Sequence, residues 1–298
     1  MVRQRSAKPL FAGSIPAVAS IQTPPGFNFV ATVESHGWYH LAPFRWEKKV
    51  LHRIELLGGE PHALEIRFAR RALHVRGATD SDELRAKLNR MFQLHLDLSE
   101  FHERAKGSPS HEWAAEERFG RLLCGSTLFE DAVKIILTTN TMWRQTVRMA
   151  ELLVAKCGRG GAFPEPEDIR RFSAEELQQD CRLGYRAKSI RALADLDVAG
   201  YQLPVAGQPE TGDRQPLTTE ECFKAYQKLP GIGPYGSAHL LAMDGRHDFI
   251  AVDTEFRRFV RERYHGGRKV ADATLVRRYA KWGRWKYLAY WSELWKWG

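Results

Sequence analysis

The ten residues from Leu229 to Ala238 read L-P-G-I-G-P-Y-G-S-A, and they constrain the local fold more than any other part of the chain. Gly231 and Gly233 permit a tight turn and a close approach of the backbone, because glycine has no side chain to clash. Pro234 suits the first position of a helix, where its missing amide hydrogen costs little. The segment therefore predicts a hairpin between two helices, with Ile232 packed between them. The free amides at the start of the second helix would face outward and favour a bound phosphate.

This hairpin alone leaves several functions open. Similar hairpins occur in ligases, polymerases and nuclease accessory domains, where they only hold the nucleic-acid backbone, and a plain turn between helices with no ligand is a further alternative. Downstream, the apolar, strand-like stretch Phe249–Val252 is followed by Asp253, which heads a new helical segment. An aspartate in this place is commonly a helix N-cap. The residues alone therefore allow either a capping or a chemical role for Asp253.

The first third of the chain has the pattern of a sheet. Short apolar runs separated by turn signals such as Gly58-Gly59 predict antiparallel strands, and the clearest runs are Phe29–Val33, Leu64–Phe68 and Ala72–Val75. After Asp80 the spacing of apolar residues becomes helical and stays so to the end. We therefore predict an α+β fold with an N-terminal antiparallel sheet lobe over residues 26–105 and a helical lobe over residues 106–298.

Residues 1–25 are rich in Ser, Ala and Pro and carry Arg3, Arg5 and Lys8 without an acidic residue. A weak targeting segment is one interpretation. Because Ser14 and Pro16 interrupt the apolar part, we expect a disordered tail instead.

The charge of the chain favours a polyanionic partner. The 45 Lys and Arg against 36 Asp and Glu give a formal net charge of +9, and the segment from Glu255 to Gly298 alone holds twelve basic and four acidic residues. Such a segment is typical of nucleic-acid binding, although a solvated basic helix with an aromatic core stripe fits the pattern as well. The aromatic residues interleaved with these charges are Trp282, Trp285, Tyr287, Tyr290, Trp291 and Trp295.

The spacing of the cysteines and the hydropathy of the chain indicate the cellular compartment of the protein. Cys124, Cys157, Cys181 and Cys222 are widely spaced and form no C-x-x-C pair, which is typical of buried thiols in a reducing compartment and excludes a compact four-cysteine iron–sulfur loop. No apolar run approaches the length of a membrane span. We expect a cytoplasmic monomer, nucleoid-associated if the source is bacterial, with no membrane partner.

The hairpin, together with an aspartate twenty residues after Gly233, resembles the signature of the helix-hairpin-helix DNA glycosylase superfamily. The resemblance extends from Phe27 to the C-terminus. Three further segments carry it. The run Ile135–Asn140 resembles the superfamily's segment that ends in an asparagine, and Phe44-Arg45-Trp46 and the L-G-Y-R-A of Leu183–Ala187 resemble 8-oxoguanine DNA glycosylases in particular.

The resemblance implies how DNA is held. Backbone amides of Gly231, Gly233 and Tyr235 would bind a phosphate of the damaged strand, and Asn140 would fill the space left by the flipped nucleotide. Arg144 follows Asn140 and would contact DNA, although a solvated polar face explains it as well. The main-chain carbonyls of Gln227, Leu229 and Ile232 would coordinate a structural monovalent cation, K⁺ or Na⁺, and no other cofactor is expected.

The resemblance also implies the chemistry. Breaking the N-glycosidic bond develops positive charge on the sugar, which a carboxylate close to the anomeric carbon stabilises; Asp253 would take this role. Bifunctional relatives place a lysine nucleophile in the second helix of the hairpin, and the matching position here is Tyr235. Because no lysine lies between Lys228 and Lys269, water would attack, and the enzyme would be monofunctional, without lyase activity.

The substrate prediction depends on the same difference from the bifunctional relatives, which is Tyr235 in the place of a lysine. Tyr235 and His239 stand where 8-oxoguanine glycosylases have their base-recognition pair, whereas an aromatic residue in the hairpin is similar to AlkA-type 3-methyladenine DNA glycosylases. We therefore expect excision of alkylated purines such as 3-methyladenine or 7-methylguanine from double-stranded DNA. The alternatives are a glycosylase for 8-oxoguanine, hypoxanthine or another deaminated base, and a non-catalytic DNA-binding protein. Candidate walls of the base pocket are Tyr235, Trp143, Trp282 and Trp285, and a plain core role is the alternative for each tryptophan.

Overall fold

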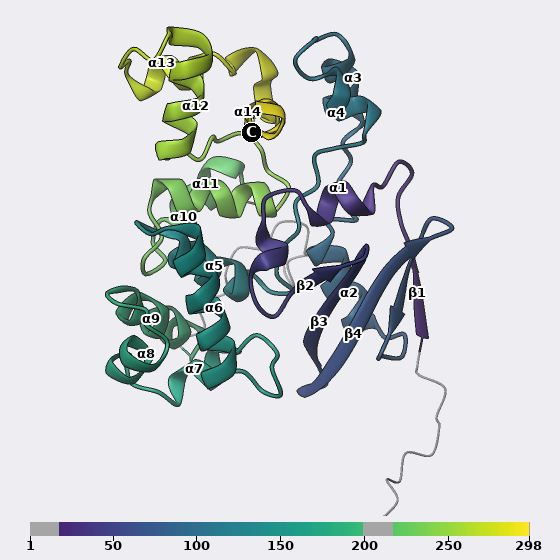
Figure 1. Cartoon of the computed structure of the whole chain (residues 1–298), viewed down its shortest axis with the longest axis vertical. Helices are drawn as coiled ribbons and strands as arrows, with labels where there is room; N and C mark the ends of the chain where they lie inside the picture. Colours follow the sequence, from purple (N-terminus) through teal and green to yellow (C-terminus); the bar gives the residue numbers. More distant parts are fainter. Residues whose placement is uncertain (1–17, 199–216, 298) are drawn as a thin grey trace, which may run out of the picture.

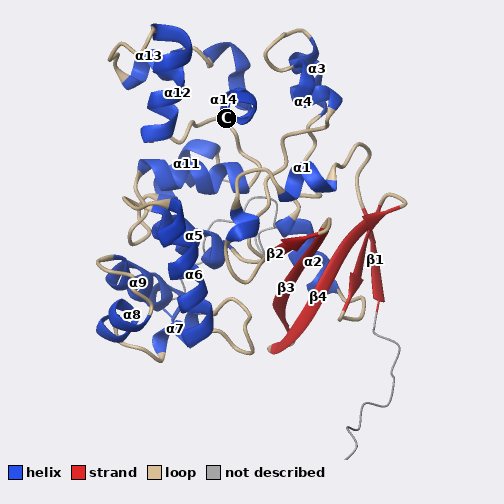
Figure 2. Cartoon of the chain, viewed as in Figure 1, coloured by secondary structure: helices blue, strands red, loops and turns tan. Residues whose placement is uncertain are grey.

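The structure, a computed structural model, describes residues 18–198 and 217–297 and combines one antiparallel sheet with a larger helical region (Figures 1 and 2). The sheet has the strand order β1-β5-β4-β3-β2. Its strands are β1 (Val18–Gln22), β2 (Arg45–Glu47), β3 (Val50–Leu57), β4 (Glu60–Ala69) and β5 (Ala72–Arg76). The tight β3–β4 turn uses Gly58 and Gly59, both with positive φ, as glycine readily permits. The predicted α+β class with an N-terminal sheet is confirmed.

The helices follow the sheet in sequence, with the exception of one short helix and one 3₁₀ turn that lie between β1 and β2. They are α1 (Phe29–Val33), α2 (Asp82–Met91), α3 (Ser99–Lys106), α4 (Glu112–Glu116), α5 (Leu128–Thr138), α6 (Trp143–Cys157), α7 (Pro166–Arg170), α8 (Ala174–Asp180), α9 (Arg186–Val198), α10 (Thr219–Tyr226), α11 (Pro234–Met243), α12 (Thr254–His265), α13 (Asp272–Arg277) and α14 (Lys286–Trp297), with 3₁₀ turns η1 (Trp38–His40) and η2 (Ala280–Trp285). Figure 1 shows the sheet on one side and helices α5 to α9 on the other.

Two sequence predictions at the N-terminus were wrong. Phe29–Val33 was expected to be a strand but forms helix α1, because the side chain of Asn28 caps it by accepting from the Ala31 amide at 3.1 Å. Val18–Gln22 was expected to belong to a disordered tail, yet it is an edge strand in which Ala19 and Ile21 are buried against β5. The rest of the predicted tail, residues 1–17, lies outside the described residues.

The hydrophobic core has two clusters. The first runs through the sheet and helices α5, α6 and α9, so the sheet lobe and the helical region share one interior across the expected boundary at residues 105 and 106. The second joins α3, α4, α12 and α14. Helix α11 contributes to both clusters, and each of its residues from Gly236 to Met243 is buried. A helix that is apolar on all sides is packed against other elements on all sides. This packing fixes the position of the hairpin at the start of α11.

The cysteines and the helix lengths add two observations. Cys124, Cys157, Cys181 and Cys222 are all buried free thiols. Within residues 18–198 and 217–297, no helix is both long enough and apolar enough to cross a membrane.

Candidate active site

The predicted hairpin is present between α10 and α11. Gly231 has a φ of 80°, and a Cβ atom at this position would lie 2.7 Å from Cβ of Ser189 in α9, so glycine is required both by the turn and by the close approach. Gly233 is the N-cap of α11 and Pro234 follows at the first helical position. Ile232 is buried at 4% exposure between the helices. The amides at the start of α11 have no carbonyl partners within their own helix, as at any helix N-terminus.

The hairpin forms one wall of a cavity of about 460 Å³. The C-terminal end of α5 forms the facing wall, and the start of α12 completes the cavity. Its lining residues are Ile135, Thr138, Thr139, Asn140, Thr141, Gly231, Gly233, Pro234, Tyr235, Gly236, Val252, Asp253, Thr254 and Arg257. Five residues predicted from sequence, Gly231, Gly233, Tyr235, Asn140 and Asp253, therefore lie around one cavity although 113 positions separate Asn140 from Asp253.

Asp253 combines a structural and an electrostatic feature. Its Oδ1 atom accepts a hydrogen bond of 2.7 Å from the Phe256 amide, so Asp253 is the N-cap of α12. An ionised carboxylate has about four acceptor sites, so the cap fixes its direction and leaves acceptor capacity toward the cavity. Burial raises the pKa of Asp253, and the neighbouring charge of Glu255 raises it further, against the lowering effect of the Phe256 amide. The carboxylate is thus poorly hydrated, and a cation that enters the cavity would interact with it strongly.

Tyr235 lies on the first turn of α11 and is half-buried. Burial and the charge of Asp253 raise the pKa of its phenol to about 12, against a hydrogen bond with Thr138. Tyr235, which stands where bifunctional relatives have a lysine, is therefore a neutral aromatic ring beside a carboxylate. It offers an apolar face and a hydroxyl group, and it carries no amine.

At the rim of the cavity, the predicted Asn140 contacts two residues to which the sequence reasoning assigned no role, Tyr185 and Arg186. Asn140 has a φ of 44° and is exposed, and its amide donates to the hydroxyl of Tyr185 at 3.4 Å. Tyr185 is 59% exposed, and its hydroxyl also contacts Thr139 Oγ1 at 3.1 Å. The Arg186 guanidinium donates to the carbonyl of Thr139 and packs 4.7 Å from the Tyr185 ring centre. The Leu183–Ala187 segment was the available signal for Tyr185, but it specified no contact.

The four remaining side chains proposed for the site are not part of the cavity lining. Trp143 and Arg144 begin α6, just beyond Asn140, and both are exposed. The Trp143 ring lies against Gly37.

Trp282 and Trp285 belong to the second hydrophobic cluster, with 4% and 3% exposure. Trp282 packs on His111 and Trp285 stacks on His247, at ring-centre distances of 4.4 and 5.6 Å. Their assignment as walls of the pocket is corrected to a core role, because an aromatic stripe on a helix can face a core as readily as a ligand.

Gln227 is the C-cap of α10, and Leu229 and Ile232 lie in the hairpin, so the three proposed carbonyl donors come from six consecutive residues. The Leu229 carbonyl accepts from the Ile232 amide at 3.0 Å, which closes the turn and leaves it one lone pair. Backbone carbonyl oxygens coordinate K⁺ in proteins, and within the described residues no group of three or more His, Cys, Asp or Glu could hold a metal ion. The donor set therefore fits K⁺ or Na⁺.

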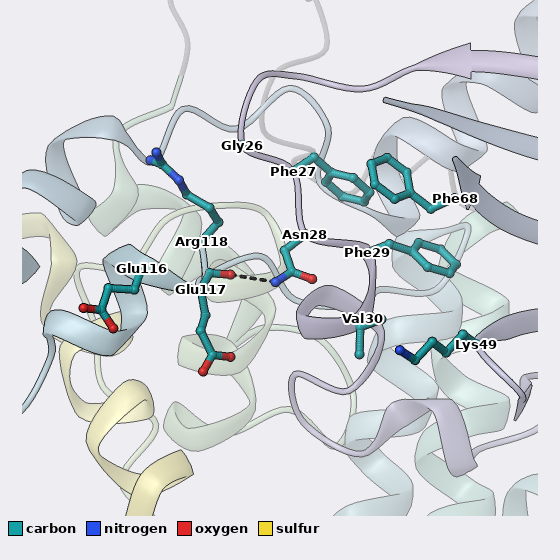
Figure 3. A pocket seen from close by; sticks show the side chains of 10 residues that line it. All are labelled: Gly26, Phe27, Asn28, Phe29, Val30, Lys49, Phe68, Glu116, Glu117 and Arg118. Carbon is teal, nitrogen blue, oxygen red and sulfur yellow. Dashed lines mark hydrogen bonds between the residues drawn. The ribbon is translucent and has the colours of Figure 1, made fainter. Parts of the chain in front are cut away.

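A second cavity, of about 400 Å³, lies between the sheet lobe and α4 (Figure 3). Phe27, Phe29 and Phe68 line it on one side, and Arg118 lies on the other side. The Asn28 amide crosses it to donate to the Glu117 carbonyl at 2.7 Å. None of the residues predicted for catalysis or DNA contact lines this cavity.

Known structures share the whole architecture. "MBOgg1 in complex with low affinity DNA ligand" matches with a TM-score of 0.72 at 19% identity, covering 95% of this chain and 96% of that one. A 3-methyladenine DNA glycosylase from Archaeoglobus fulgidus matches with 0.71 at 20% identity, covering 93% and 98%. An 8-oxoguanine glycosylase/lyase from Clostridium acetobutylicum matches with 0.70 at 16% identity, covering 91% of both chains. At sequence identities of 16% to 20%, these matches show that the chain shares the fold of these structures.

A comparison with curated protein sequences finds no match. A family model, described as HhH-GPD superfamily base excision DNA repair protein, matches residues 133–284. This range contains the C-terminal half of α5, the hairpin, Asp253 and α12, and it is more than half of the 298 residues. The chain belongs to the HhH-GPD superfamily of base excision DNA repair proteins.

Proposed function

We propose that this chain is a monofunctional DNA glycosylase that releases alkylated purines such as 3-methyladenine or 7-methylguanine from double-stranded DNA. One observation carries the proposal: a half-buried carboxylate, Asp253, shares a cavity with the hairpin, in which Tyr235 stands in the position expected for a lysine. A clamp that only grips DNA does not need this carboxylate, which argues against a non-catalytic role.

The mechanism follows from these residues. A base inside a duplex is out of reach, so the nucleotide must be flipped into the cavity at a cost of a few kcal/mol. The amides of Gly231, Gly233 and Tyr235 would anchor a phosphate, the hairpin carbonyls would hold a monovalent cation that completes the anchor, and Asn140 would occupy the vacated space. The exposed ring of Tyr185, bonded to Asn140, would support it there.

Bond cleavage would then depend on Asp253. The electron pair of the N-glycosidic bond leaves with the base, and the carboxylate stabilises the positive charge on the sugar. The oxygen of a water molecule forms the new bond to the anomeric carbon, and its proton passes to Asp253 or to solvent. An alkylated purine carries a positive charge, which makes it a better leaving group and draws it to aromatic faces such as Tyr235, an attraction of about 1 to 2 kcal/mol when desolvated.

The test of the substrate is single-turnover release from matched duplexes. We expect 3-methyladenine and 7-methylguanine to be released faster than 8-oxoguanine or hypoxanthine. Faster release of 8-oxoguanine would reverse this order and assign the chain to oxidised bases. Binding of every duplex without any release would leave only the clamp function.

We expect no covalent intermediate with DNA. Because Tyr235 supplies no amine, borohydride should trap no adduct with a lesion duplex under conditions that trap a glycosylase/lyase used as the positive control. A Tyr235→Lys variant tests whether the position alone limits this chemistry. A trapped adduct of the wild-type protein would contradict the proposal, and peptide mapping would identify the amine responsible.

We also expect affinity for undamaged duplex to fall steeply with salt. Arg144 follows Asn140, Lys228 lies at the hairpin, and Lys188 lies in α9, next to Ser189, which packs against Gly231; all three are exposed. Each phosphate that is neutralised contributes about 0.9 to the negative slope of log K against log salt concentration. Lys228→Ala should reduce the slope by about 1. Lys49→Ala, an exposed lysine in the second cavity, is the matched control and should leave it unchanged. A flat response of the wild-type protein would exclude DNA as the partner.

A further inference from the structure

An arginine lies one helical turn after Asp253 but does not pair with it. Arg257 is the fourth residue after Asp253, and both residues line the same cavity. At this spacing on a helix, acidic and basic side chains are neighbours and commonly form an ion pair. Asp253 nevertheless forms no salt bridge with any residue that the structure describes. The absence of this pair needs a physical cause.

The guanidinium of Arg257 is held by a different carboxylate. Its Nε donates to Oδ1 of Asp272 at 2.9 Å, and its Nη2 donates to Oδ2 at 2.8 Å. Two parallel bonds of this kind fix the direction of an arginine as well as its partner. The bonds to Asp272 raise the pKa of Arg257 against the lowering effect of burial, and the charge of Asp253 raises it further. The arginine is therefore bound to one carboxylate and within electrostatic reach of the other.

The other ionisable groups near Asp253 supply no positive charge. Its charge acts on three phenols, those of Tyr235, Tyr287 and Tyr290. Burial and this charge raise the pKa of each phenol, so all three are neutral. Glu255 adds a negative charge, and its carboxylate is paired with Arg258 at 2.5 Å. Arg257 is the only basic residue in the lining of the cavity.

The pair between Arg257 and Asp272 contributes little to folding. The two side chains are 34% and 43% exposed, and ion pairs at such exposure stabilise a protein only slightly. Arg261 is a further cation near Asp272, and it donates to the carbonyl of Val270 at 3.2 Å. The main consequence of the Arg257 pair is therefore local, because it decides which carboxylate the arginine neutralises.

We propose that Asp272 is a positioning residue that holds Arg257 away from Asp253, so that the Asp253 carboxylate stays free to stabilise the positive charge of the sugar. This inference rests on the proposed function. An opposite charge within a few ångströms stabilises an ionised carboxylate, and a carboxylate satisfied in this way attracts a second positive charge less. Without Asp272, the guanidinium would turn to Asp253, one helical turn away.

The pH profile of base release tests this role. Single-turnover release is measured across the acid limb and the plateau, with whichever of the four duplexes in the substrate test the wild type processes fastest. Asp272→Asn should move the acid limb to lower pH by about one pH unit, because pairing with Arg257 lowers the pKa of Asp253. The plateau rate should fall about 10-fold, since one pH unit corresponds to a factor of ten in the preference for the ionised form.

A second background separates positioning from folding. In Arg257→Gln, no arginine remains to pair with Asp253, so adding Asp272→Asn should change the plateau rate by less than about 2-fold and leave the acid limb in place. Asp180→Asn is the matched control, because it breaks a similarly exposed pair, with Lys156 at 2.8 Å, outside the cavity lining. Its pH profile should be that of the wild type.

The outcomes distinguish this inference from the proposed function. Equal slowing by Asp272→Asn in both backgrounds, or slowing with an unmoved acid limb, would give Asp272 a structural role only and overturn the inference while the glycosylase function stands. An unchanged profile of Asp272→Asn would overturn it as well. If the wild type binds the four duplexes and releases no base, the proposed function fails, and the inference fails with it.

Discussion

Asp253→Asn should reduce base excision by about 10²- to 10³-fold, the usual loss when one electrostatic stabiliser of a transition state is removed. Asparagine is a good N-cap, so the hydrogen bond from the Phe256 amide and the start of α12 should persist. The substitution therefore removes the charge and retains the shape. Single-turnover release measures the chemical step, and fluorescence anisotropy with an undamaged duplex should give an affinity close to that of the wild type.

The pH dependence gives a second measurement on the same variant. Since burial raises the pKa of Asp253, the active carboxylate is lost as the pH falls through a value above the ordinary 3.8, and the acid limb of the wild-type profile should lie there. This limb should be absent from the residual activity of Asp253→Asn. Glu262→Gln removes an exposed carboxylate from the same helix and is the matched control, with wild-type excision expected. Wild-type turnover by Asp253→Asn would remove Asp253 from the mechanism.

Local signals explain why the hairpin and Asp253 could be predicted from the sequence. The turn needs glycine at Gly231 because of its positive φ, and the helix start tolerates Pro234. The residues that determine the hairpin are therefore close together in the sequence. The capping boxes at Ser173 and Thr218 are equally local. Such features depend on backbone geometry over four or five residues, which sequence records directly.

Features that depend on tertiary packing could not be predicted in this way. Trp282 and Trp285 have the spacing of a helical stripe, but only the position of their segment relative to Phe101 decides that they face a core. The edge strand Val18–Gln22 exists because β5 offers it a partner 50 or more residues away. Periodicity carries no information on such long-range pairing.

The burial of charge between the sheet and α5 is a further feature that the sequence did not indicate, and it supports the site. Glu130 of α5 has a 1% exposed side chain; its carboxylate lies 3.1 Å from Arg53 of β3 and 2.6 Å from Lys134. Its Oε2 also accepts from the Ser126 amide at 3.0 Å. Burial alone would raise the pKa of Glu130, but Arg53 and Lys134 outweigh it and lower the pKa to about 2. This cluster joins the sheet to the helix whose C-terminal end carries Asn140.

Glu130→Gln should therefore lower the free energy of unfolding by about 3 to 5 kcal/mol, because Arg53 and Lys134 stay buried with less compensating charge. Urea denaturation at pH 7 measures the change. Glu151→Gln breaks the exposed pair with Arg148 and should leave the unfolding midpoint nearly unchanged, as is usual for surface pairs.

The pKa of Glu130 also predicts how the free energy of unfolding depends on pH. The pKa of Glu130 is lower in the folded chain than in the unfolded chain, so its stabilisation is present above the ordinary value of 4.5 and is lost as the pH falls toward about 2. The difference in unfolding free energy between wild type and Glu130→Gln should shrink over this window, whereas Glu151→Gln should follow the wild type throughout. A difference that stays constant from pH 5 to pH 2 would mean that the loss comes from packing, and that the charge of Glu130 does not hold the sheet against α5.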